Sequence, residues 1–407
     1  MLIEIHAIQN HSPANLNRDD LGTPKTCYFG GVLRSRISSQ CIKRSIRLSD
    51  EFKLLCGGIR TRRLPKHLAE QVKKEDKEKD VLRLAEDVVQ KCGVLRDEEQ
   101  DDKKKDVIVF LSKPAAAQMV KLLREAPEKT TEKQIKDLAR QFAEIIQRER
   151  YVPDMALSGR MLEPAKTAKE VWDKLDCTIE AALQVAHAIS THVARPEVDY
   201  YVAADDVKGE DAGGAHIGEA MIASACFYKY FSINWETLVG NLRGFGENHE
   251  KLAAHTVGAF IRGLALTVPS GKKNSHAHNN RPDGMLVEIR DCAPISYANA
   301  FAKPAVESER DLIAQSIAQL GQYVHDLDVG YGKPKERLWF SPNLQYHLIA
   351  QTRDKDGKKE QQEIDLVERG FNFNSLESLV PAVIKALPGK LDWADVQKVV
   401  INSEVAP

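Results

Sequence analysis

The chain begins with a pattern typical of β-strands followed by an amphipathic helix. Residues 2–9 alternate apolar and polar positions and are rich in β-branched side chains, and a polar segment over residues 11–25 predicts a loop after this strand. Residues 32–37 predict a second strand, which leads into a helix over residues 39–48. Further strands are expected over residues 223–233 and 285–289.

Between residues 59 and 152 the pattern changes to helical periodicity. Apolar residues recur every three or four positions, and the positions between them are dense in Lys and Glu, which is typical of a solvated helix face. This pattern predicts a helical insertion after the first strands and helix. The recurring positions are Leu82, Leu84, Ala85, Val88 and Val89 in one segment, and Ile135, Leu138, Phe142, Ile145 and Ile146 in another.

After residue 153 the pattern mixes strand-like and helical segments. Residues 179–191 are rich in small side chains and predict a helix. Residues 195–222 contain two short apolar pieces around an acidic, glycine-rich connection. Because glycines supply turn geometry, this segment predicts an extended β-hairpin.

The composition is that of an ordinary globular protein. The 407 residues include 43% hydrophobic residues, enough to build a sizeable core. Lys and Arg (58) nearly balance Asp and Glu (59), so any affinity for nucleic acid must come from local segregation of charge. No apolar run reaches the roughly 18 residues that span a bilayer, and the N-terminus lacks a signal-peptide pattern, so we expect a cytoplasmic protein without a membrane partner. Seven scattered cysteines without a CxxC pair argue against a zinc ribbon.

Positive charge is segregated near the N-terminus. From Leu21 to Ser49 the chain contains six Lys and Arg residues and no Asp or Glu. On a helix, the polar and basic side chains of residues 39–48 fall in one sector, and Ile42 and Ile46 fall on the opposite side. Like charges at this spacing destabilise a helix by a few tenths of a kcal/mol per pair, and a bound anion would remove that penalty. The residues of the polar sector are Gln40, Lys43, Arg44 and Arg47.

The strand before this helix adds to the same predicted surface. Arg34 and Arg36 are two positions apart, so their side chains point to one face of the sheet. They lead toward the helix N-terminus, where backbone N–H groups and the hydroxyls of Ser38 and Ser39, either of which can be the N-cap, suit a phosphate. Strand, cap and helix therefore predict a track for a phosphodiester backbone bound without base recognition. The alternative is that the arginines pair with acids elsewhere in the fold.

Eight short strings, in order along the chain between residue 3 and about residue 302, carry a resemblance to a known family. They are HSPANLNRDD, FGG, RISSQCIKRSIR, ALSGRM, AHAISTH, DYYVAADD, GAHIGEA and YANAF. These strings resemble the CasC family, the backbone subunits of type I-E CRISPR Cascade complexes. The last hundred residues match this family weakly, and residues 60–150 hardly at all.

The resemblance implies an α+β fold shaped like a hand. Its parts are an RRM-like (ferredoxin-like) palm, a helical fingers insertion and a β-hairpin thumb. The expected bounds are residues 1–58, 153–194 and 223–345 for the palm, 59–152 for the fingers, 195–222 for the thumb, and 346–407 for a C-terminal extension packed on the palm.

The resemblance also implies a function and partners. Several copies would form a head-to-tail filament along one CRISPR guide RNA, bind its phosphates, displace one base at regular intervals and leave the other bases free to pair with a target DNA strand. The other Cascade subunits, which are a processing nuclease and small and large subunits, would complete the complex. No cofactor, metal or catalytic residue is implied.

Carried over from the family, RNA-backbone contacts fall on Lys25, Ser38 and the polar helix sector. Met161 is similar to the family's wedge against the bases, and Val202 and Ile217 stand at the hairpin positions that act with it. Lys272 and Lys273, in a flexible glycine-containing loop, can also reach a phosphate. The full set of candidate RNA contacts is Asn17, Arg18, Lys25, Arg34, Arg36, Ser38, Ser39, Gln40, Lys43, Arg44, Arg47, Lys272 and Lys273.

Two other functions remain open from the residues. RRM-like CRISPR proteins include ribonucleases that process repeats or cut target RNA, and metal-free cleavage needs a general base and a cation near the scissile phosphate. His6, His11, Lys25 and Arg36 are the residue types available for that role. A general single-strand RNA chaperone is the third possibility.

Metal-binding patterns are weak in this sequence. Asp19 and Asp20 could hold a metal, as a loop acid does in type III backbone subunits that cut RNA. Capping their own loop, or pairing with Arg18, is the simpler role. His276 and His278 resemble half a zinc site, but the sequence offers no third ligand.

Overall fold

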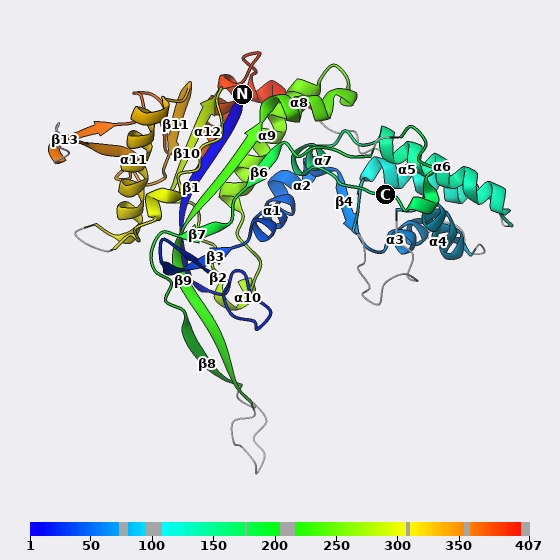
Figure 1. Ribbon diagram of the computed structural model, residues 1–407, viewed down its shortest axis with the longest axis horizontal. Helices are drawn as coiled ribbons and strands as arrows, with labels where there is room; N and C mark the ends of the chain where they lie inside the picture. The colour runs from blue at the N-terminus through cyan, green and yellow to red at the C-terminus, as the bar shows by residue number, and fades with distance from the viewer. Residues whose placement is uncertain are drawn as a thin grey trace, which may run out of the picture. The chain divides into compact units, whose positions relative to one another are not determined.

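Two structural units divide the chain, and each is discontinuous in sequence (Figure 1). The computed structural model describes residues 1–72, 80–94, 108–127, 129–175, 177–203, 216–306, 310–353 and 359–399. The first unit comprises Met1–Phe52, Gln184–Asn234 and Val257–Trp393, and the second comprises Lys53–Leu183, Trp235–Thr256 and Ala394–Pro407.

A ten-stranded sheet forms the centre of the first unit. Strand β1, Leu2–Ala14, pairs antiparallel with β9, His216–Asn234, on one side and with β10, Gly284–Arg290, on the other. The strand order is β14-β11-β10-β1-β9-β7-β3-β2, with β6 and β8 paired to β9. The remaining strands are β2, Thr26–Phe29; β3, Val32–Ile37; β6, Leu183–Val185; β7, Ala188–Ser190; β11, Glu336–Phe340; and β14, Asn372–Phe373.

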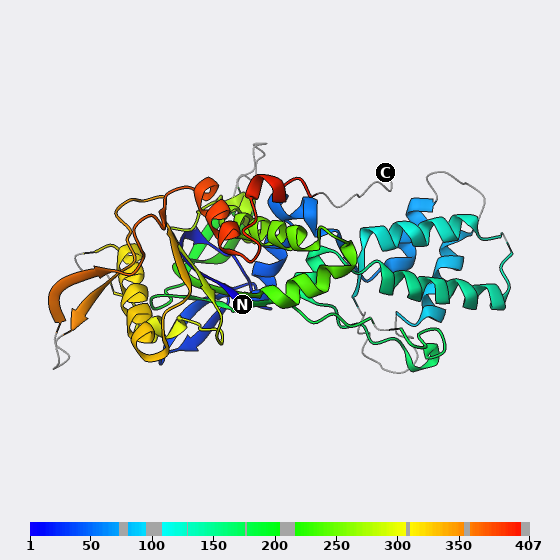
Figure 2. The same cartoon turned by 90° about the horizontal axis from the view of Figure 1, so that it is seen from above.

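Helices cover both faces of this sheet (Figure 2). On one face, Phe231 of β9 packs edge to face on Phe260 of α9, His249–Leu266, with 5.6 Å between ring centroids. On the other face, Ile8 and Tyr228 belong to a core that includes Ile317, Leu320 and Val324 of α11, Leu312–Tyr331. The sheet is largely antiparallel and carries helices on both faces, so the predicted α+β class is confirmed.

Strand β8, Glu197–Ala203, and the first part of β9 form a two-stranded ribbon that extends from the sheet (Figure 1). Val202 pairs with Ile217 in its register. These two strands occupy the segment for which the sequence predicts a hairpin. The acidic connection between them, residues 204–215, lies outside the described residues.

The second unit has its own helical core. Most of its apolar residues come from four helices, with Val88 and Val89 of α4 and Phe142 and Ile146 of α6 fully buried. Thr131 and Gln134 form a reciprocal capping box at the start of α6. These helices are α3, Leu64–Val72; α4, Val81–Cys92; α5, Lys113–Glu125; and α6, Glu132–Arg148; strands β4, Gly58–Thr61, and β5, Val109–Ser112, pair beside them.

Three sequence-based expectations differ from the structure. Residues 179–191 do not form a helix, because Ile189 pairs with Tyr228 and the segment adds short strands to the sheet. The predicted loop over residues 11–25 is shorter, since β1 continues to Ala14. Residues 153–183, which the family resemblance placed in the palm, belong to the second unit, whose core includes Trp172.

Shorter elements complete the described chain. They are α2, Asp50–Cys56; α7, Pro153–Ser158; α8, Trp235–Leu242; α10, Lys273–His276; α12, Leu376–Ala386; α13, Trp393–Val396; β12, Ile349–Arg353; and β13, Lys359–Asp365. None of the helices in the described ranges has the length and apolar character that crossing a membrane requires.

Candidate nucleic-acid interface

Helix α1, Ser39–Arg47, is amphipathic and docks through one side. Ser38 is its N-cap, and the Ser38 side chain accepts a hydrogen bond from the Cys41 N–H at 3.3 Å. Ile42 and Ile46 are buried, and Ile46 lies close enough to Gly263 of α9 that a side chain there would press on it. The apolar side predicted from the helical spacing is therefore the packed side.

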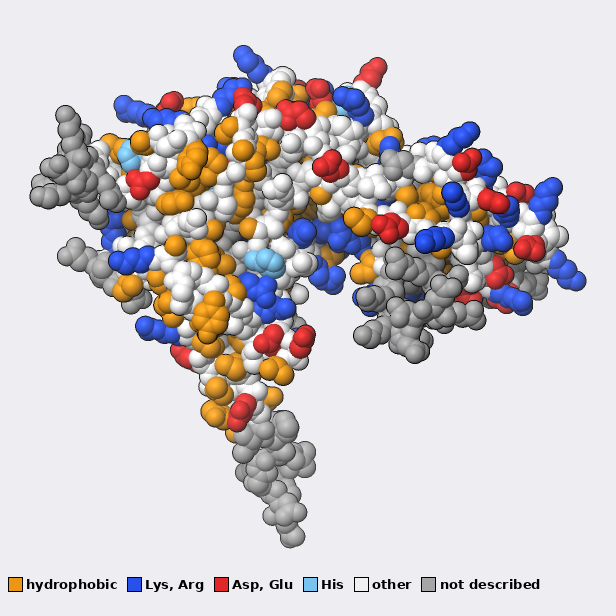
Figure 3. Space-filling view, viewed as in Figure 1, with side chains coloured by type: hydrophobic (Ala, Val, Ile, Leu, Met, Phe, Trp, Pro, Cys, Tyr) orange, Lys and Arg blue, Asp and Glu red, His pale blue; other side chains and the backbone are white. Residues whose placement is uncertain are grey.

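The opposite side of α1 carries the predicted polar sector. Gln40 and Arg44 are exposed, and Lys43 and Arg47 are partly exposed. Figure 3 shows a cluster of Lys and Arg side chains over this helix. Packing of the apolar side thus fixes the basic side toward solvent, where it can meet an anion.

A loop ties Lys25 to the start of α1. The Asn17 side-chain oxygen accepts from the Ser38 N–H at 2.9 Å, and the Asn17 carbonyl accepts from the Lys25 N–H at 2.8 Å. The Arg36 N–H in turn donates to the Lys25 carbonyl at 2.8 Å. Loop, strand end and helix cap are therefore fastened together, and Asn17 acts as their link.

His187 lies beside Arg36 and the start of α1, a position that the sequence pattern does not reveal. Its Nδ1 lies 3.1 Å from Nη1 of Arg36 and 3.3 Å from the Ser39 backbone nitrogen. Partial burial is the largest cause that lowers the pKa of His187, and three neighbouring cations lower it further. These cations are Arg36, Lys25 and Lys43. Burial and these cations therefore favour the neutral form of the imidazole.

Arg34 does not belong to this surface. Its side chain is fully buried, and its guanidinium donates to the carbonyls of Phe29, Ser190 and Phe301 at 3.3, 3.1 and 2.7 Å. Arg36 lies on the same face of β3 but remains partly exposed. We therefore remove Arg34 from the candidate RNA contacts: it fastens β3 to its neighbours, a role that two-residue periodicity does not reveal.

The N-terminus of α1 is less open to a phosphate than the sequence suggested. The Ser39 N–H is directed at His187, the Cys41 N–H at the Ser38 hydroxyl, and the Ser38 N–H at Asn17. Both serines are also mostly buried. A phosphate at this helix end would therefore have to be held by side chains rather than by the backbone donors.

Two further basic segments border α1. Gly271 approaches the carbonyls of Asn15 and Leu16 so closely that a Cβ would lie 2.7 and 2.5 Å from them. This contact holds the next residues, Lys272 and Lys273, beside the loop that carries Arg18, and all three side chains are exposed. A shallow hollow lined by residues including Arg18, Cys41 and Gly271 joins this loop to the helix.

The predicted wedge residues belong to different units. Met161, in the second unit, is 84% exposed, which is unusual for a methionine. Val202, in the first unit, is 60% exposed on β8 beside exposed Tyr200 and Tyr201. The side chain of Ile217 lies outside the described set. An exposed thioether and an exposed apolar ribbon are surfaces of the kind that a partner covers.

Most of the residues that the sequence offered for catalysis or metal binding are buried or are engaged in hydrogen bonds. His6 and His11 are both 0% exposed, and burial lowers the pKa of each, that of His11 to about 2. The Asp19 carboxylate accepts hydrogen bonds from the Leu21 and Thr23 N–H groups and from the Thr23 hydroxyl. His278 is buried and its Nε2 lies 2.9 Å from a backbone carbonyl. Asp19 and His278 thus hold their own loops, whereas His6 and His11 are enclosed in the core of the first unit.

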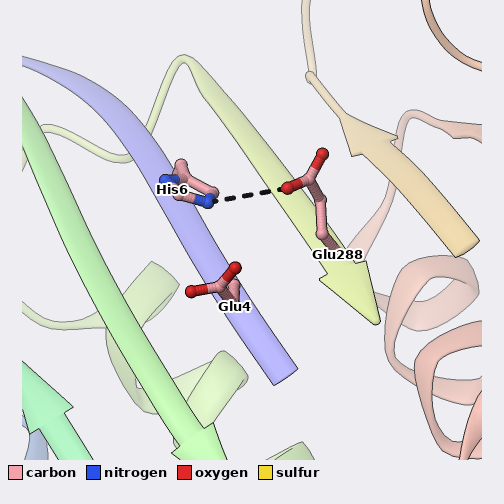
Figure 4. A group of neighbouring side chains, drawn as sticks. All are labelled: Glu4, His6 and Glu288. Carbon is pink, nitrogen blue, oxygen red and sulfur yellow. Dashed lines mark ion pairs between the residues drawn. The ribbon is translucent and has the colours of Figure 1, made fainter. Parts of the chain in front are cut away.

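Glu4, His6 and Glu288 gather on one face of the sheet (Figure 4). They could bring three ligand atoms together, but Arg290 pairs with both carboxylates, at 3.2 Å to Glu4 and 2.9 Å to Glu288. Arg337 also pairs with Glu288, at 2.7 Å. Two buried cations already neutralise this cluster, so we interpret it as an ion-pair network of the core rather than a metal site.

Comparisons with known proteins agree with this architecture. A solved structure described as "CRISPR RNA-guided surveillance complex, pre-nicking" contains a chain of 25% identity, with a TM-score of 0.71 over 95% of this chain and 100% of that one. A second, described as "CRISPR RNA-guided surveillance complex", has 23% identity and a TM-score of 0.56, over 95% and 99% of the two chains, and supports the fold alone. No curated protein sequence matches the chain.

The fold and the similarity to a chain of a CRISPR surveillance complex together place this chain among the CRISPR-associated proteins. The chain belongs to the family of CT1975-like proteins, whose family model matches residues 3–368.

Proposed function

We propose that this CT1975-like protein is the backbone subunit of a type I-E Cascade complex, similar to CasC. In this proposal an RRM-like palm binds the phosphates of a guide RNA, and copies assemble head to tail along it in the cytoplasm. The observation that carries the proposal is the basic side of α1, which lies in an acid-free stretch of sequence and is held beside Lys25 and Arg36. Such a surface suits a phosphodiester backbone of any sequence.

The exposed ribbon supports the assembly part of the proposal. Strand β8 exposes large apolar side chains on a thin two-stranded element, and water is a poor environment for that much apolar surface. We infer that the ribbon lies across the RNA of the adjacent copy. Val202, Ile217 and Met161 would then replace the stacking that one displaced base loses. A contact between different surfaces of neighbouring copies need not close into a ring, so it suits a filament.

We also propose that the subunit is not a nuclease. The two histidines that the sequence offered as general bases are buried in the sheet, and the Asp19 carboxylate is engaged by its own loop. A general base must come within hydrogen-bonding distance of the proton that it abstracts, and buried His6 and His11 are poorly placed for that. The guide RNA, other Cascade subunits and the target DNA strand paired to the guide are the partners in this account.

Replacing both Lys43 and Arg47 by Ala tests the RNA-binding surface. We expect weaker binding of single-stranded RNA of every sequence. The slope of log K against log salt should fall by about 1.4, since each lost single-strand phosphate contact removes about 0.7. Fluorescence anisotropy at several salt concentrations measures this slope. The double variant Lys66→Ala with Lys121→Ala removes the same charge from exposed positions on the helical unit and should leave the slope unchanged. An unchanged slope in the first variant contradicts the assignment.

A further inference from the structure

The imidazole of His187 has a defined direction in the basic surface. It stands in the connection between β6 and β7 and points its Nδ1 at the start of α1, 3.3 Å from the Ser39 nitrogen and 3.1 Å from Nη1 of Arg36. In the described part of the chain, its hydrogen-bond partners are these two groups. The side chain is exposed.

Both partners fix the tautomer of this ring. A backbone N–H and a guanidinium N–H can only donate hydrogen bonds, so Nδ1 must carry a lone pair and accept. A neutral imidazole then carries its proton on Nε2, and that proton points away from both partners. Protonation of Nδ1 would lose both bonds and add a positive charge beside Arg36, Lys25 and Lys43, which agrees with the lowered pKa of His187.

We propose that His187 is a further RNA contact, whose Nε2–H donates a hydrogen bond to a phosphate oxygen of the bound strand. The Ser39 N–H belongs to the positive end of the α1 dipole and polarises the ring from behind, so the imidazole extends a donor from the helix end to the surface. The inference rests on the proposed function, because it names a residue of the same interface. His187 supplies direction there without charge, whereas Lys25, Arg36 and Lys43 supply the attraction.

Two substitutions separate this role from a structural one. Gln places an amide N–H near the position of Nε2, and Asn places a carbonyl oxygen near the position of Nδ1. If His187 binds RNA, His187→Asn weakens binding of a single-stranded RNA about tenfold, the effect of losing one hydrogen bond to a charged oxygen, and His187→Gln stays within about threefold of the wild type. If His187 only holds Arg36 and Ser39, the order of the two variants is reversed.

The salt dependence gives a second readout in the same titrations. Since a neutral ring releases no counterion, His187→Asn should lower the affinity at every salt concentration and leave the slope unchanged. A changed slope would instead indicate that Arg36 has moved. In wild-type protein with ¹⁵N-labelled histidine, RNA should shift the Nε2 resonance of His187 more than its Nδ1 resonance, and equal or absent shifts overturn the proposal.

Different results would contradict the proposed RNA interface and the proposed role of His187 within it. If Lys43→Ala with Arg47→Ala weakens RNA binding but His187→Asn does not, the interface stands and the role of His187 is wrong. If the wild-type protein binds no single-stranded RNA, the proposed function fails and this inference fails with it.

Discussion

Glu288→Ala is expected to lower the free energy of opening of the central sheet by about 3–5 kcal/mol, the usual cost of removing one partner from a buried ion pair. Glu288 is fully buried and accepts from Arg290 at 2.9 Å, Arg337 at 2.7 Å and the Tyr297 hydroxyl at 2.8 Å. Its removal leaves two guanidinium groups without their shared anion. Because both are almost completely buried, water cannot replace it without opening the sheet.

Hydrogen exchange of the β1 and β10 amides measures this effect, since it reports the local free energy of opening even when two units unfold separately. The matched control is Glu363→Ala, which removes the acid of the exposed Arg310–Glu363 pair. That change should cost less than about 1 kcal/mol. If both variants exchange alike, the buried network does not stabilise the sheet, and the cluster in Figure 4 requires another explanation.

The double variant Met161→Gly with Val202→Gly is expected to abolish periodic displacement of bases along the bound RNA. Unstacking a base costs a few kcal/mol, and the two exposed apolar side chains are the surface proposed to compensate for it. A fluorescent base analogue placed at successive positions of the RNA should brighten periodically with the wild type. With the double variant the signal should be uniform.

A control for this variant is Leu344→Gly, which removes another exposed apolar side chain, 71% exposed, from the first unit. It should keep the periodic signal. A periodic signal that persists in the double variant would show that the two residues do not displace bases, and would leave the phosphate-binding surface unaffected.

The sequence predicts helix α1 well because local interactions dominate there. Ile42 and Ile46 follow the 3.6-residue period and are buried, and Ser38 caps the helix as its residue type favours. The exposed side of α1 then follows from the buried side. The short strings in order along the chain also indicate a CRISPR-associated protein, and the match to the CT1975-like family confirms that prediction.

Other features depend on contacts that a sequence pattern does not contain. The small residues of 179–191 suit a helix by spacing, but pairing of Ile189 with Tyr228 makes the segment part of the sheet. Arg34 and Arg36 have the same two-residue period, yet only Arg34 is covered, by the carbonyl of Phe301 from 267 residues further along the chain. His187 could have been noticed as a polar residue in one of the family-like strings, although its contact with Ser39 is visible only in the fold.

The most direct test of the central claim is native mass spectrometry of the protein bound to guide-like RNAs of increasing length. A backbone subunit that coats RNA without cutting it predicts that bound copies increase in steps with RNA length and that the RNA keeps its full mass. A copy number that stays fixed on longer RNA, or RNA recovered as shorter fragments, would contradict the account.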